Sequence, residues 1–80
     1  MPRYLLHHTH RSDECGVAYA AWKGYDSPLR RRPTLASCLE GGHAVWWNVE
    51  APDGRRALDQ VPPFVATRTT ATEVSEVVIP

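Results

Sequence analysis

The sequence lacks an excess of charge of either sign. Nine Lys or Arg residues balance nine Asp or Glu residues, so the formal net charge at pH 7 is zero. A protein that coats DNA or RNA regardless of sequence usually carries a strong basic excess, because it must neutralise backbone phosphates. We therefore expect no nucleic-acid partner.

Long apolar runs are missing as well. No stretch approaches the roughly 20 residues needed to cross a bilayer, and the apolar run near the N-terminus is too short for a secretory signal. We therefore expect a cytoplasmic protein with no membrane partner. In a reducing compartment its only two cysteines, Cys15 and Cys38, are predicted to remain thiols rather than form a disulfide.

The chain has 80 residues, which predicts a single domain over residues 1–80. A chain of this size buries only about 63 % of its surface. That is enough for one thin core of two layers, and it leaves little room for a deep pocket inside one subunit. A second subunit could supply the other wall of a cleft.

The predicted elements follow the order β-α-β-β-α-β. Strands are expected over residues 3–8, 34–40, 43–50 and 72–79, and helices over residues 12–24 and from about residue 54 to the prolines at 62 and 63. Gly41-Gly42 is a hairpin signal between the second and third strands. This order is typical of the α+β ferredoxin-like fold, a four-stranded antiparallel sheet with two helices on one face. Strand three then lies between strands one and two.

One face of such a sheet has no helix to cover it. The chain carries three tryptophans, and two of them, Trp46 and Trp47, are adjacent in the best predicted strand, so they point to opposite faces. An exposed apolar face of this kind usually contacts another surface. We therefore expect a homodimer formed through the open face, an assembly of the dimeric α/β-barrel type.

Histidine and cysteine are the residues that most suggest chemistry. The predicted topology brings six of them to one end of the domain, although they lie in two groups about thirty residues apart: His7, His8, His10, Cys15, Cys38 and His43. With a two-residue hairpin loop, Cys38 would oppose Val45 and share a face with His43. Imidazole and thiolate are the usual ligands of zinc, nickel and copper.

The sequence therefore predicts a metal site at this end of the sheet. Four ligands are expected from five candidates: His8, His10, Cys15, Cys38 and His43. Neither HHxH nor CxxxxH is a standard metal motif, and a single histidine at a strand end is more commonly solvated. The prediction depends on the six residues lying together.

Three stretches resemble the small nickel-binding ferredoxin-like proteins of actinobacteria, a family of otherwise unknown function. They are the opening MPRYLL, the segment GGHAVWWNVEAPD and the terminal TEVSEVVIP. The resemblance implies a homodimer of ferredoxin-like subunits that binds a divalent metal. It does not extend residue by residue to HHTH and the cysteine that follows, so the ligands named above rest on the spatial argument.

A second resemblance covers ALDQVPPF followed by TEVSEV. These segments are similar to muconolactone-isomerase-like members of the dimeric α/β-barrel group. This likeness implies a sheet-to-sheet dimer that encloses a cleft, which is catalytic in some members.

Three interpretations of function follow. The first is a cytoplasmic homodimer that binds nickel, zinc or copper. The alternative is a dimeric α/β-barrel enzyme, an isomerase, cyclase or cofactor-poor oxygenase acting on a small organic molecule, in which His43 or His8 is the acid/base and Trp46 or Trp47 lines the cleft. The third is an interaction module with no site. Arg30-Arg31-Arg32 could hold a phosphate or carboxylate, although such a run is more commonly a solvated loop.

Overall fold

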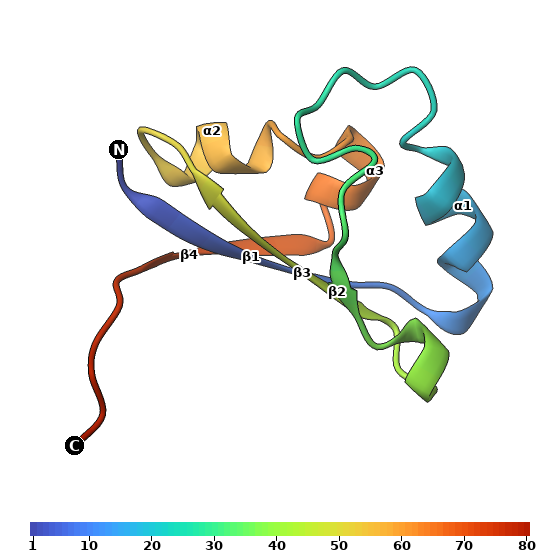
Figure 1. Ribbon diagram of the computed structural model, residues 1–80. Coiled ribbons are helices and arrows are strands. Elements are labelled where there is room, and N and C mark those ends of the chain that lie inside the picture. The colour runs from blue at the N-terminus through green and yellow to red at the C-terminus, as the bar shows by residue number, and fades with distance from the viewer.

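Four strands form one antiparallel sheet in the computed structural model, which describes residues 1–80 (Figure 1). The strands are β1 (Arg3–Thr9), β2 (Leu35–Ala36), β3 (Ala44–Glu50) and β4 (Thr69–Val74), in the order β2-β3-β1-β4. The four-stranded antiparallel sheet of an α+β protein is thereby confirmed, with the third strand between the first and second as predicted.

Short helices connect the strands. They are η1 (Ser12–Glu14), α1 (Cys15–Ala20), η2 (Cys38–Glu40), α2 (Gly54–Leu58) and α3 (Pro63–Ala66), of which η1 and η2 are 3-10 turns. Asp53 caps α2, since its carboxylate accepts a hydrogen bond from the Arg56 backbone N–H at 2.8 Å. The sequence predicted that the prolines end this helix. A further helix, α3, begins at Pro63, because proline fits the first turn of a helix.

Side chains alternate across the sheet and divide it into two faces. On β1, Tyr4, Leu6 and His8 are buried, whereas the residues between them are exposed. Leu6 lies opposite Trp47 on β3, and α2 and α3 cover this face, as Figure 1 shows. The core consists of Tyr4, Leu6, Trp47, Val49, Ala51, Ala57, Val61 and Val65.

The opposite face carries no helix. Trp46 lies there, half-buried, and stacks on His7 with ring centroids 5.2 Å apart and an angle of 3° between the planes. Trp47 packs in the core on the other side. The prediction that these two tryptophans point to opposite faces is confirmed.

The predicted second strand is wrong in length and register. Only Leu35–Ala36 forms β2, and Cys38–Glu40 is a 3-10 turn. Ala36, not Cys38, pairs with Val45. The reason is a longer hairpin loop: the Ser37 N–H donates to the Ala44 carbonyl and the Ser37 carbonyl accepts from the Gly42 N–H, both at 2.9 Å. The strand therefore stops at residue 36, and the chain turns over residues 38–43.

The last strand lies earlier in the chain than predicted. It was expected over residues 72–79, but β4 ends at Val74, which pairs with Arg3 at the first position of β1. Beyond Val74 there is no partner strand. Val77, Val78 and Ile79 consequently lie exposed in a tail that leaves the sheet (Figure 1), despite their high strand propensity.

Candidate metal centre

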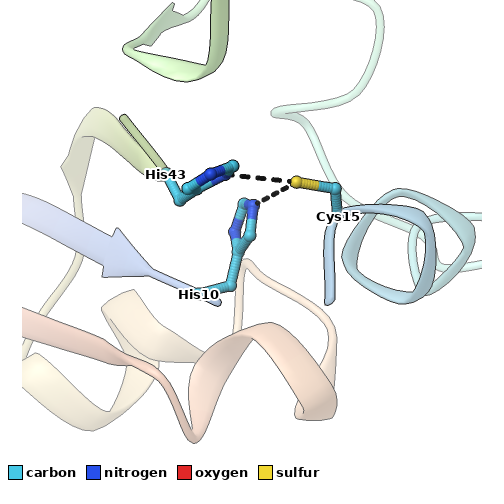
Figure 2. Close-up of side chains that lie close together, drawn as sticks. All are labelled: His10, Cys15 and His43. Carbon is cyan, nitrogen blue, oxygen red and sulfur yellow. Dashed lines mark hydrogen bonds between the residues drawn. The ribbon is translucent and has the colours of Figure 1, made fainter. Parts of the chain in front are cut away.

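Three potential metal ligands converge where β1 ends and β3 begins. Cys15 Sγ lies 3.2 Å from His10 Nε2 and 3.3 Å from His43 Nδ1 (Figure 2). All three ligand atoms lie within 4.8 Å of one another. We call these residues the His/Cys cluster.

The β-ladder brings the two histidines of the cluster together. Thr9 is the last residue of β1 to pair with β3, and it lies opposite Ala44. One step further the His10 N–H donates a hydrogen bond to the His43 carbonyl at 3.0 Å, which continues the pairing beyond the strand ends. The same register that buries the core thus holds both imidazoles at one end of the two central strands.

Glu14 fixes the turn that presents Cys15. Its carboxylate accepts hydrogen bonds from the Arg11 backbone N–H at 2.9 Å and from Arg68 Nη2 at 2.9 Å and Nε at 3.1 Å. These donors, the Arg11 N–H first and then Arg68, lower the pKa of the Glu14 carboxyl below its usual value. The Arg68 guanidinium also lies over the Phe64 ring, 3.8 Å from its centroid. Glu14 therefore ties η1, and with it Cys15, to the end of α3.

A chain of hydrogen bonds orients His10 from behind. His8 is only 1 % exposed, and its Nδ1 lies 3.2 Å from Thr69 Oγ1. The Thr69 hydroxyl donates to the Val65 carbonyl at 2.7 Å, so its oxygen is left to accept the Nδ1–H of His8. Burial first, then the neighbouring His10 and Arg68 charges, lowers the pKa of His8 and favours its neutral form.

The tautomer of His10 follows from this chain. Neutral His8 has an unprotonated Nε2, which lies 2.9 Å from His10 Nδ1 and accepts a hydrogen bond from the Nδ1–H of His10. That assignment leaves the lone pair of His10 on Nε2, the atom that faces Cys15. A ligating histidine in a metal site usually donates its second ring N–H to such a partner, which fixes the ring and its tautomer.

The cluster has the ligand type and the spacing of a transition-metal site. Tetrahedral coordination with typical zinc distances separates a thiolate sulfur and an imidazole nitrogen by about 3.6 Å. The two S···N distances here are 3.2 and 3.3 Å, close to that separation, and the two imidazole nitrogens lie within 4.8 Å of each other. Two imidazoles and one thiolate suit zinc, nickel or copper, and they do not suit magnesium or calcium. Three protein ligands leave one tetrahedral position open.

A half-open cleft of about 760 Å³ adjoins the cluster. His8, Val45 and Trp47 contribute from the sheet, and α1 and the segment around β2 and η2 line its two sides. Trp22 packs against Trp47 with ring centroids 5.6 Å apart. Both His10 and Cys15 line the cleft, so a small molecule in the cleft can reach the cluster.

Comparisons with models of protein families, with curated proteins and with solved structures give no match to this chain. The resemblance to nickel-binding ferredoxin-like proteins therefore stays a prediction. None of the helices combines the length and the apolar character that spanning a bilayer requires.

The structure gathers three of the five candidate ligands, His10, Cys15 and His43. His8 is buried directly behind His10, and it contacts His10 rather than the thiol. Cys38 lies exposed on η2, where it lines the cleft but does not belong to the cluster. Both cysteines are free thiols in the structure.

The residues that support the cluster were not predicted from the sequence. Glu14 follows Arg11 by three residues, a spacing that fits a side chain reaching back to the residue that caps the turn. Arg68 and Thr69 carry no signal in the sequence. Their contacts with Glu14 and His8 span 54 and 61 residues and exist only once the sheet has formed.

Proposed function

We propose that this protein binds one divalent transition-metal ion, zinc, nickel or copper, through His10, Cys15 and His43. The observation that carries the proposal is the convergence of one thiol and two imidazole nitrogens within 4.8 Å. The hydrogen-bond chain through His8 adds support, because it presents an unprotonated Nε2 of His10 to the site. The likeness to nickel-binding ferredoxin-like proteins favours nickel, whereas the N₂S ligand set with an open position is familiar for zinc.

The test is calorimetric titration of zinc and of nickel into protein purified without an affinity tag. We expect about one ion per chain for the wild type. Cys15→Ser and His43→Ala should each bind at least tenfold more weakly, because loss of one of three ligands leaves an incomplete coordination shell.

Matched controls separate the cluster from the other thiol and another imidazole. Cys38→Ser and His7→Ala should bind as the wild type does, since neither residue belongs to the cluster. If Cys15→Ser and His43→Ala retain wild-type affinity, the cluster is not the metal site. If Cys38→Ser weakens binding as much as Cys15→Ser, the site has a fourth ligand that the present geometry does not include.

We further propose that the protein is a homodimer joined through the open face of the sheet. That face exposes Leu5 and carries the stacked His7–Trp46 pair, and Val77, Val78 and Ile79 lie exposed in the tail that follows β4. Light scattering at micromolar concentration should give twice the 9.0 kDa chain mass. A mass of one chain at high concentration would exclude the dimer.

The cleft favours a second candidate function, an enzyme that acts on a small organic molecule. His8 and Trp47 line the cleft, whereas Trp46 lies on the opposite face of the sheet, so of the two tryptophans only Trp47 could contact a substrate there. Of the two candidate histidines, His8 lines the cleft and His43 does not, so His8 is the candidate acid/base. Failure of the wild type to bind zinc, nickel or copper would favour this alternative.

A further inference from the structure

The cleft concentrates positive charge in a protein whose net charge is zero. Four cationic residues line it, and no Asp or Glu does: the four are Lys23, Arg30, Arg31 and Arg32. None of the four forms an ion pair, although four other arginines of the chain do. Of these cations only Arg30 has a side-chain hydrogen bond, to the Tyr25 carbonyl at 3.3 Å. The cleft therefore offers unneutralised positive charge to an anion.

Most of the remaining lining is apolar, apart from His8, His10 and Thr34. Trp22, Leu29 and Trp47 face the interior together with smaller aliphatic groups, and the volume of about 760 Å³ lies within the usual range for a small-molecule site. An inorganic anion has no apolar surface to bury against these side chains. An anion with a flat hydrocarbon body matches both the charge and the surface.

The arginine loop holds an unusual backbone conformation at the edge of the cleft. Arg31 has φ of +64°, in the left-handed region that residues other than glycine seldom adopt. Such conformations concentrate at ligand sites, where the surrounding fold maintains them. Arg31 and Arg32 are exposed and adjacent, and an arginine guanidinium can bind an oxyanion through two parallel hydrogen bonds.

We propose that the cleft binds a small organic anion with a ring-sized apolar body and one oxyanion group, a carboxylate or a phosphate. The oxyanion contacts Arg31 and Arg32, and the body packs against Trp22, Leu29 and Trp47. Its far end then lies beside His10 and Cys15, next to the open metal position. The proposal extends the proposed function by naming the ligand class of that site, and it rests on the metal only for this last contact.

The test uses three naphthalene probes that share one body: 1-naphthoate, 1-naphthyl phosphate and the uncharged 1-naphthalenemethanol. Each is titrated calorimetrically into the wild-type protein in EDTA and again after zinc loading. We expect at least one of the two anions to bind tenfold or more tightly than the alcohol, and the tighter one identifies the oxyanion. Equal affinities for all three probes, or no binding of any of them, would overturn the proposal.

A double variant locates the anion contact. Arg31→Ala with Arg32→Ala should weaken binding of the anions at least tenfold and leave the alcohol unchanged. The matched control is Arg55→Ala with Arg56→Ala, a second adjacent pair that lies on α2 and outside the cleft lining. If the control weakens the anions equally, general charge and not the cleft binds them, and the proposal fails.

The EDTA arm keeps this proposal distinct from the metal proposal. Anion binding in EDTA that is lost with Arg31 and Arg32 supports the cleft ligand even if the wild type takes up no metal. Conversely, metal binding that requires Cys15 stands even if no naphthalene probe binds. Trp22→Ala supplies a further check on the body of the ligand, since it should weaken all three probes, the alcohol included.

Discussion

The sharpest prediction from the structure concerns His8, which does not belong to the cluster. We expect His8→Leu to weaken zinc and nickel binding although it leaves all three proposed ligands in place. Leucine is similar in size to histidine and suits a position that is 1 % exposed, but it cannot accept the hydrogen bond from the Nδ1–H of His10. His10 then loses the hydrogen bond that fixes its ring and its tautomer. The free energy of metal binding becomes less favourable, because binding must now order the imidazole ring.

The magnitude follows from a single hydrogen bond of 2.9 Å. Its net worth is about 0.5–1.5 kcal/mol, and loss of an outer partner of a ligating histidine typically costs about 10- to 100-fold in metal affinity. Because every 1.4 kcal/mol is about a factor of ten, both figures agree near tenfold. We therefore expect the dissociation constant of His8→Leu to rise about tenfold.

The assay is competition against a chromophoric chelator, with urea unfolding in EDTA to establish that the variant folds. His7→Leu is the matched control, because His7 lies on the same strand but faces away from the cluster and stacks on Trp46. His8→Gln should recover part of the metal affinity, since an amide oxygen can accept a hydrogen bond from the Nδ1–H of His10. Wild-type affinity in a folded His8→Leu protein would refute the argument that His8 orients His10.

Two further predictions concern stability in the absence of metal. Leu6→Ala should lower the free energy of unfolding by about 2–5 kcal/mol, because Leu6 is fully buried and the sheet cannot close the cavity; a loss below 1 kcal/mol in urea titration would contradict the assigned core. The lowered pKa of Glu14 means that its hydrogen bond from the Arg11 N–H and its ion pair with Arg68 stabilise the fold fully above about pH 4.5, and that this stability is lost as the pH falls through the lowered pKa. Glu14→Gln should therefore be less stable than the wild type at pH 7, the two should converge in acid, and a constant difference at all pH values would argue against the Arg68 contact.

Much of the sheet could be predicted from local pattern. Alternation along residues 3–9 and 44–50 assigns Leu6 and Trp47 to one face, and the order of elements places strand three beside strand one. The alternation and the order of elements together suffice to place His10 and His43 at the same end of the sheet. The end of the sheet at which the cluster lies was accordingly predictable from the sequence.

The bounds of the second and last strands were predicted wrongly for one physical reason: a strand extends only as far as it has a partner strand to pair with. Residues 72–79 have strong strand propensity, yet β4 ends where β1 begins. Directly after β2, the backbone hydrogen bonds of Ser37 with Gly42 and Ala44 close a longer loop than the glycine pair suggests. That loop removes Cys38 from the strand, so its position relative to the cluster could not be inferred from spacing.

The cluster also bears on how the fold opens. The segment between His10 and His43 includes α1, the arginine loop and β2, and β2 contributes only two residues to the sheet. A region with so few ladder bonds should open locally while β1, β3 and β4 stay paired, and its amide hydrogens should exchange with solvent faster than those of the core. An ion held by His10, Cys15 and His43 would clamp both ends of that segment at once. Metal would then slow exchange selectively between residues 11 and 43 and leave the exchange of β4 nearly unchanged.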